Sequence, residues 1–155
     1  MIGRVPEVPA PDPTSDRAAD RAAVEAVVAR FFAAFVSGPD AAEHAADLRA
    51  VLLPQALVVR TDPTAPTNPT TYDVEGFIAP RVALLAAGTM TGFREWVVTG
   101  RTDLAGDIAQ HWCTYAKAWR QDGIEHTGSG TKSIQLIRTD AGWRISAVAW
   151  TDDPA

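Results

Sequence analysis

Apolar residues in the first third of the chain recur at the spacing of an α-helix, and they form one stripe along it. Thr14 or Ser15 can cap the start of this helix, and Gly38 is suited to the left-handed position that ends it. Because four prolines precede the helix, we expect residues 1–14 to form a flexible arm and residues 15–155 to form a single domain. The stripe consists of Val24, Val27, Val28, Phe31 and Phe35.

Two shorter helices are predicted further along the chain. Asp40 can cap the first of them, which ends before Pro54 because proline cannot continue a helix. The next helix extends from Asp73, which can cap it, to Gly88, and Pro80 is expected to break or kink it. The inner face of that helix consists of Val74, Phe77, Ile78, Val82 and Leu85.

The second half of the chain has the pattern of an antiparallel sheet. A short strand at 57–59 and a loop at 61–71, rich in proline and threonine, come before it. After Gly88, β-branched and aromatic residues dominate, all five tryptophans occur, and turn signals recur at regular intervals. Sequential strands joined by short turns form a meander. The four strands that we expect are 92–103, 107–120, 124–139 and 143–151.

Helices followed by a long antiparallel sheet predict an α+β fold, in which three helices cover one face of the sheet. Strands this long twist and curl the sheet into a cone, which creates a pocket. Three segments carry a further signal, namely DIAQHWCTY at 107–115, GTKSIQLIR at 130–138 and GWRI at 142–145. In these segments and in its order of elements, the chain resembles the nuclear transport factor 2-like (NTF2-like) superfamily, in its SnoaL-like branch, over roughly 16–151.

The resemblance implies a cone-shaped fold but no single activity. The superfamily contains isomerases, cyclases, dehydratases and many binding proteins without catalysis, and a fold does not determine its chemistry. Related chains often direct histidines and a serine from the last strand into the cone. Here the two inward positions of that strand are expected to be Ala147 and Ala149.

Composition excludes several classes of protein. The 155 residues carry a formal net charge of -5 and no basic patch, which argues against a nucleic-acid partner. A single cysteine cannot form an intramolecular disulfide, and no apolar run has the length of a signal peptide or a membrane span, so we expect a cytoplasmic protein. No nucleotide-binding, serine-hydrolase or metalloprotease motif is present, so we expect no cofactor and no metal.

Strand alternation predicts which polar side chains share the concave face. His111, Cys113 and Tyr115 lie on one face of their strand, and a two-residue turn at 122–123 would place Cys113 opposite Lys132. We therefore predict that these four residues surround the pocket, although one bulge would reverse the assignment. The apolar residues on the same face are Ile134, Leu136, Trp143, Ile145, Ala147 and Ala149.

Each of the four candidates has a chemical and a structural interpretation. His111 is a general base or a histidine bonded within the sheet, and Tyr115 is a donor to a carbonyl or a satisfied core residue. Lys132 is a cation that faces an acidic ligand or a lysine whose amine reaches water. Cys113 is better explained as packing than as a nucleophile. Zinc binding by His111, Cys113 and His126 lacks any recognised ligand spacing.

Three functions follow from these residues. The first is non-catalytic binding of a small apolar molecule, because the last strand lacks an acid–base pair. The alternative is a cofactor-independent isomerase, cyclase or dehydratase that acts on a small apolar or polycyclic substrate. A titratable group deep in the pocket beside a donor would distinguish them. The third is a dimerising module with a filled cone.

Whichever function applies, we expect a homodimer. Trp112 lies on the convex face, where it would otherwise be exposed, and large exposed apolar patches usually mark interfaces.

Overall fold

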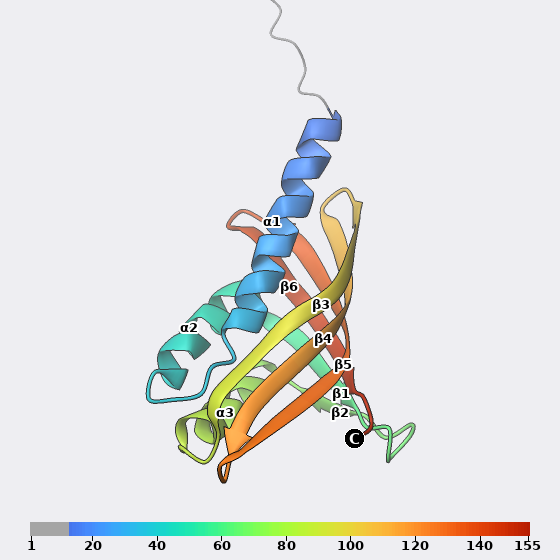
Figure 1. The fold of residues 1–155 in the computed structure, drawn as a ribbon. Coiled ribbons are helices and arrows are strands. Elements are labelled where there is room, and N and C mark those ends of the chain that lie inside the picture. Colours follow the sequence, from blue (N-terminus) through green and yellow to red (C-terminus); the bar gives the residue numbers. More distant parts are fainter. Residues whose placement is uncertain (1–12) are drawn as a thin grey trace, which may run out of the picture.

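The computed structural model describes residues 13–155, which contain three helices and one six-stranded sheet (Figure 1). The α+β class predicted from the sequence is confirmed. The predicted arm lies outside the described residues apart from its last two, which belong to the first helix. The helices are α1 (Pro13–Ala33), α2 (Ala41–Val51) and α3 (Val74–Ala86). The strands are β1 (Leu52–Thr61), β2 (Thr70–Tyr72), β3 (Thr91–Ala105), β4 (Ile108–Gln121), β5 (Ile124–Thr139) and β6 (Gly142–Asp152).

The sheet is mixed, with the strand order β2-β1-β6-β5-β4-β3. Strands β3 to β6 form the antiparallel meander expected from the turn signals, so that prediction is confirmed. The short strand predicted at 57–59 is longer than expected, because β1 pairs in parallel with β6. The predicted loop at 61–71 overlaps a further strand, β2, which pairs antiparallel with β1. The first difference arises from pairing with a strand some ninety residues later, which local turn signals do not report.

The helix ends follow some predicted signals and not others. Asp73 caps α3 as expected, since its carboxylate accepts a 2.7 Å hydrogen bond from the Gly76 N–H. The side chain of Asp40 makes no capping hydrogen bond, which corrects its predicted role. Helix α1 ends at Ala33, before Gly38. Pro80 does not break α3; the helix continues through it, although proline has no N–H to donate there.

The hydrophobic core lies between α1 and the concave face of the sheet (Figure 1). The predicted stripe of α1 supplies Val24, Val28 and Phe31, which are at most 2% exposed. They belong to the same core cluster as Ile134 and Leu136 of β5, which are fully buried, as strand alternation predicted. Burying a large apolar side chain stabilises a fold by roughly 1.5–3 kcal/mol, so this contact between helix and sheet holds the cone together.

A bulge in β6 changes the side chains that face the helices. Leu136 pairs with Ile145, but Gln135 pairs with Ala147, so Ser146 is one residue without a partner. Strand alternation reverses at such a point. The prediction that Ala147 and Ala149 face inward is therefore wrong. Downstream of the bulge the buried positions are Val148 and Trp150, and Ala149 is exposed.

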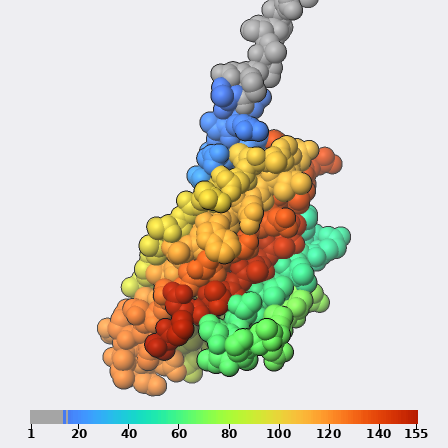
Figure 2. Space-filling model, turned by 90° about the vertical axis from the view of Figure 1, so that its right-hand side faces the viewer, coloured from blue at the N-terminus to red at the C-terminus, as the bar shows by residue number. Residues whose placement is uncertain are grey.

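Within residues 13–155, no helix covers the convex face of the sheet (Figure 2). Figure 2 views this face, on which the strands lie side by side from β3 to β2. Trp112 is 53% exposed, and Ile108 and Leu57 are also exposed. No helix of the described part is long and apolar enough to span a membrane. Strand alternation places Trp112 on the convex face, and its exposure agrees with that assignment.

The homodimer stays a prediction, and Trp112 provides its test. If copies associate through the convex face, the parent should sediment as a dimer at micromolar concentration and Trp112→Glu as a monomer, because a buried charge opposes association. Ile124→Glu is the control, since Ile124 is as exposed as Trp112 but starts β5 at the turn after β4. A parent that sediments only as a monomer would contradict the prediction.

Gly130 should be far less tolerant of a side chain than Gly128 on the same strand. A Cβ on Gly130 would overlap the Tyr115 hydroxyl and the Thr151 carbonyl oxygen, and a backbone atom cannot move aside. We expect Gly130→Ala to lower the free energy of unfolding in urea by about 1–3 kcal/mol. Gly128→Ala should cost clearly less, because its Cβ would meet the flexible end of Lys117 at 2.8 Å. Equal losses would contradict this account.

Candidate functional site

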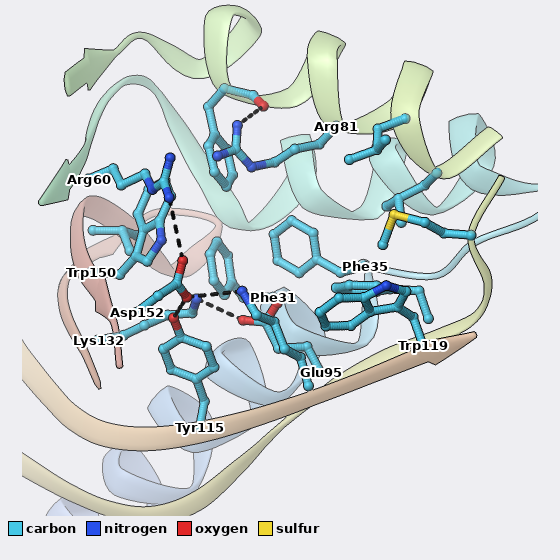
Figure 3. Close-up of a pocket in the computed structure, with 17 residues that line it drawn as sticks. Phe31, Phe35, Arg60, Arg81, Glu95, Tyr115, Trp119, Lys132, Trp150 and Asp152 are labelled. Atoms are coloured by element: carbon cyan, nitrogen blue, oxygen red, sulfur yellow. Dashed lines mark hydrogen bonds and ion pairs between the residues drawn. The ribbon is translucent and has the colours of Figure 1, made fainter. Parts of the chain in front are cut away.

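A cavity of about 300 Å³ lies between α3 and the concave face of the sheet (Figure 3). Its walls are mostly apolar, with aromatic rings the largest group, and charged groups converge on it from the strands and from α3. The aromatic residues are Phe31, Phe35, Phe77, Phe93, Tyr115, Trp119 and Trp150. The charged residues are Arg60, Arg81, Glu95, Lys117, Lys132 and Asp152, and the aliphatic residues are Leu84, Leu85, Met90 and Val148.

Regular spacing in the sequence places these side chains. On β4, alternate residues Tyr115, Lys117 and Trp119 point into the cavity, as expected for one face of a strand. On α3, Phe77 and Arg81 are four residues apart and therefore lie on the same helix face. The bulge at Ser146 makes β6 contribute its even-numbered residues from 148 onward.

Lys132 and Glu95 form a buried ion pair in the cavity wall. The Lys132 Nζ atom lies 2.7 Å from the Glu95 carboxylate, and the two side chains are only 8% and 9% exposed. The same Nζ atom lies 3.8 Å from the centre of the Tyr115 ring. Burial lowers the pKa of Lys132 below that of an ordinary lysine, although Glu95 opposes this shift. The cavity wall is therefore polar at this point, but the charges of Lys132 and Glu95 compensate each other.

Asp152 accepts hydrogen bonds from two neighbours on the sheet. The Tyr115 hydroxyl donates to its Oδ1 atom over 2.5 Å and the Lys117 Nζ atom over 3.0 Å. Burial raises the pKa of Asp152, but the bonds from Tyr115 and Lys117 outweigh it, so the pKa lies below its ordinary value. Burial and the carboxylate of Asp152 raise the pKa of Tyr115, which stays a neutral donor. Figure 3 shows this group at one end of the cavity.

Arg81 differs from the other cations of the cavity. Its guanidinium carbon lies 4.1 Å from the centre of the Phe77 ring, with Tyr72 and Trp150 at 5.3 and 5.2 Å. It donates one 2.9 Å hydrogen bond to the Phe77 carbonyl. In the described part of the chain, no carboxylate lies within ion-pair distance of it. Burial lowers the pKa of Arg81; the hydrogen bond and charge interaction with Tyr72 oppose this shift, and the neighbouring Arg60 adds to it.

The four residues predicted from the sequence do not all line this cavity. Tyr115 and Lys132 do, whereas His111 and Cys113 are buried on the same strand face outside its lining. Cys113 pairs with Lys132, as the predicted two-residue turn requires. Burial raises the pKa of its thiol to about 11, which disfavours the reactive thiolate.

His111 lies in a separate buried cluster. Its Nδ1 atom is 2.8 Å from the Thr102 hydroxyl, which donates to Glu25 of α1 over 3.3 Å. Burial lowers the pKa of His111, and Glu25 only partly offsets this. The arrangement agrees with a histidine bonded within the structure. The other histidine considered for zinc, His126, stacks on Trp119 with the ring centres 5.4 Å apart.

Sequence reasoning missed most of the charged cavity residues. Nothing local in the sequence fixes the strand face of Glu95, and Asp152 escapes prediction because the bulge moves it inward. Arg81 has a usable signal, since it follows Phe77 of the predicted inner face by four residues. Alternation places Lys117 on the strand face of Tyr115, but nothing in the sequence marks it as a site residue. Arg60 follows a strand whose extent was underestimated.

Comparisons with known proteins support the fold. No family model and no curated protein sequence matches the chain. Among solved structures, an NTF2-like superfamily protein from Salmonella enterica has a TM-score of 0.70 and 11% identity, covering 90% of this chain and 94% of that one. An NTF2-like protein with a cystatin-like fold from Novosphingobium aromaticivorans has a TM-score of 0.68 and 16% identity, covering 91% and 90%.

A hexachlorocyclohexane dehydrochlorinase, LinA-type3, from Novosphingobium barchaimii is also similar. Its TM-score is 0.69 at 14% identity, and the match covers 91% of each chain. At identities this low, the likeness concerns the fold and not the activity. The sequence resemblance and the solved structures agree, and the chain has the fold of the nuclear transport factor 2-like superfamily.

Proposed function

We propose that the chain binds a small, largely apolar molecule in the cavity between α3 and the sheet. The observation that carries this proposal is an aromatic cavity on which a few polar groups converge, the usual composition of a ligand site. Its volume of about 300 Å³ is near the lower end for such sites, and roughly twice that of a cavity that holds benzene. A ligand with one or two rings therefore fits better than a larger polycyclic one.

A second candidate function is a cofactor-independent isomerase, cyclase or dehydratase. Asp152 favours it, because a half-buried carboxylate beside the Tyr115 donor is the arrangement that acid–base chemistry requires. The dehydrochlorinase among the structural neighbours is consistent with elimination chemistry on this fold. Against it, the lowered pKa of Asp152 makes a weaker base, and Tyr115 and Lys117 already occupy one of its oxygens. Binding without catalysis remains the better supported proposal.

Filling the cavity should abolish binding. We expect 2-methoxynaphthalene, a neutral fluorescent probe with two rings, to bind saturably to the parent in an anisotropy titration. Val148→Phe should weaken binding at least about tenfold, because the added ring would occupy the space of the ligand. Ala149→Phe is the matched control, since the adjacent Ala149 is exposed on the convex side. The proposal is wrong if the parent binds no naphthalene probe of this size, neutral or charged, or if folded Val148→Phe binds as tightly as the parent.

The pH dependence of stability should report the state of Asp152. A carboxyl whose pKa is lower in the folded state stabilises the fold above its unfolded pKa of about 3.9, and this contribution disappears as the pH falls through the folded value. We therefore expect the advantage of the parent over Asp152→Asn to be constant from pH 7 to about 5 and to shrink toward pH 3, measured by urea unfolding. Tyr115→Phe removes one donor and should reduce the pH-dependent part. An advantage that grows on acidification would contradict the assigned direction.

A further inference from the structure

The cavity carries more positive than negative charge, although the chain as a whole is acidic. Four cationic and two anionic side chains line it, a formal surplus of +2, in a chain of formal net charge -5. The carboxylates are already engaged, Glu95 with Lys132 at 2.7 Å and Asp152 with Lys117 at 3.0 Å. The two cations that remain are both arginines, Arg60 and Arg81.

The two arginines have different surroundings. The Arg60 side chain is 45% exposed and also lies 3.8 Å from Asp152, so water and a carboxylate compensate its charge. Arg81 is half-buried among Phe77, Tyr72 and Trp150. Ring faces attract a cation, but they cannot replace the hydrogen-bond acceptors that a guanidinium loses when it leaves water.

Arg81 also has hydrogen-bond donors that remain available to a ligand. A guanidinium carries five N–H donors; one is used by the Phe77 carbonyl and another by the Tyr72 side chain, which leaves three for a ligand. Within residues 13–155, every other cation that lines the cavity has a carboxylate within 4.0 Å, and Arg81 has none. Figure 3 shows it on α3, facing the cavity from the side opposite Tyr115. A ligand in the cavity can therefore reach this cation without breaking an existing ion pair.

We propose that the ligand of this cavity is a small aromatic carboxylate, whose acid group pairs with Arg81 while its rings contact the aromatic walls. The inference rests on the proposed binding function and specifies its ligand class. A guanidinium fork matches the two oxygens of a carboxylate, and such charge-assisted pairs are about twice as strong as neutral hydrogen bonds. A cationic ligand would meet repulsion from the surplus charge, and a neutral one would leave Arg81 without a counter-ion.

The test compares two ligands of nearly equal shape by titration calorimetry. Naphthalene-2-carboxylate carries the acid group, and naphthalene-2-carboxamide replaces it by a neutral amide. We expect the parent to bind the carboxylate about tenfold to a hundredfold more tightly than the amide. Arg81→Met, which keeps a long apolar stem, should remove this preference, because the affinity for the carboxylate should fall to that for the amide.

Arg49→Met is the matched control, because Arg49 pairs with Glu75 at 2.7 Å and does not line the cavity. It should keep the preference of the parent. Should Arg81→Met fail to fold by circular dichroism, Arg81→Lys replaces it, and the preference should then fall without disappearing, because the charge remains and the fork is lost.

The outcomes separate this inference from the binding function. Equal affinity of the parent for both ligands would overturn the acid preference and leave the binding function standing. A preference that survives in folded Arg81→Met would overturn the assignment of Arg81. Failure of both naphthalene ligands and of 2-methoxynaphthalene to bind the parent would overturn the binding function together with the inference.

Discussion

The position of one unpaired residue, Ser146, determines the chemistry of the cone. Because the bulge reverses alternation in β6, Val148, Trp150 and Asp152 face the helices from that point on. Trp150 then packs on Phe77, with ring centres 5.7 Å apart, and forms part of the aromatic wall. Asp152 reaches the Tyr115 hydroxyl and supplies one of the two carboxylates of the cavity. In regular alternation the small side chains of Ala147 and Ala149 would take these places, and β6 would contribute neither an indole nor an acid to the wall.

The charges of the cavity have two different roles. Removing one member of the Lys132–Glu95 pair would leave the other buried and uncompensated, so this pair constrains how β3 and β5 face each other. Asp152 similarly ties β4 to β6 through Tyr115 and Lys117. These pairs hold the wall in one arrangement, and their charges are satisfied within the protein. Arg81 belongs to neither group, because aromatic rings and one carbonyl surround it.

Prediction from sequence succeeded where the controlling signals are local. Turns between adjacent strands are short-range features, so the meander and the pairing of Cys113 with Lys132 followed from them. Prediction from sequence failed where the structure depends on pairing between two segments that are far apart in the chain. The length of β1 depends on β6, some ninety residues later, and Ser146 has nothing in its sequence that marks a bulge. Asp152 was missed for that reason, so the site was predicted without its most accessible acid.

The parallel pairing of β1 with β6 also constrains the order in which the chain can fold. The helices and β1 to β2 are synthesised first, yet one edge of β1 has no partner until residues 142–152 emerge from the ribosome. Since β6 supplies Val148, Trp150 and Asp152, the cavity cannot exist before that pairing forms. Contacts between segments so far apart slow folding and leave strand edges open to other chains in the interval. The feature that completes the cone is therefore also the one that exposes the nascent protein longest to aggregation.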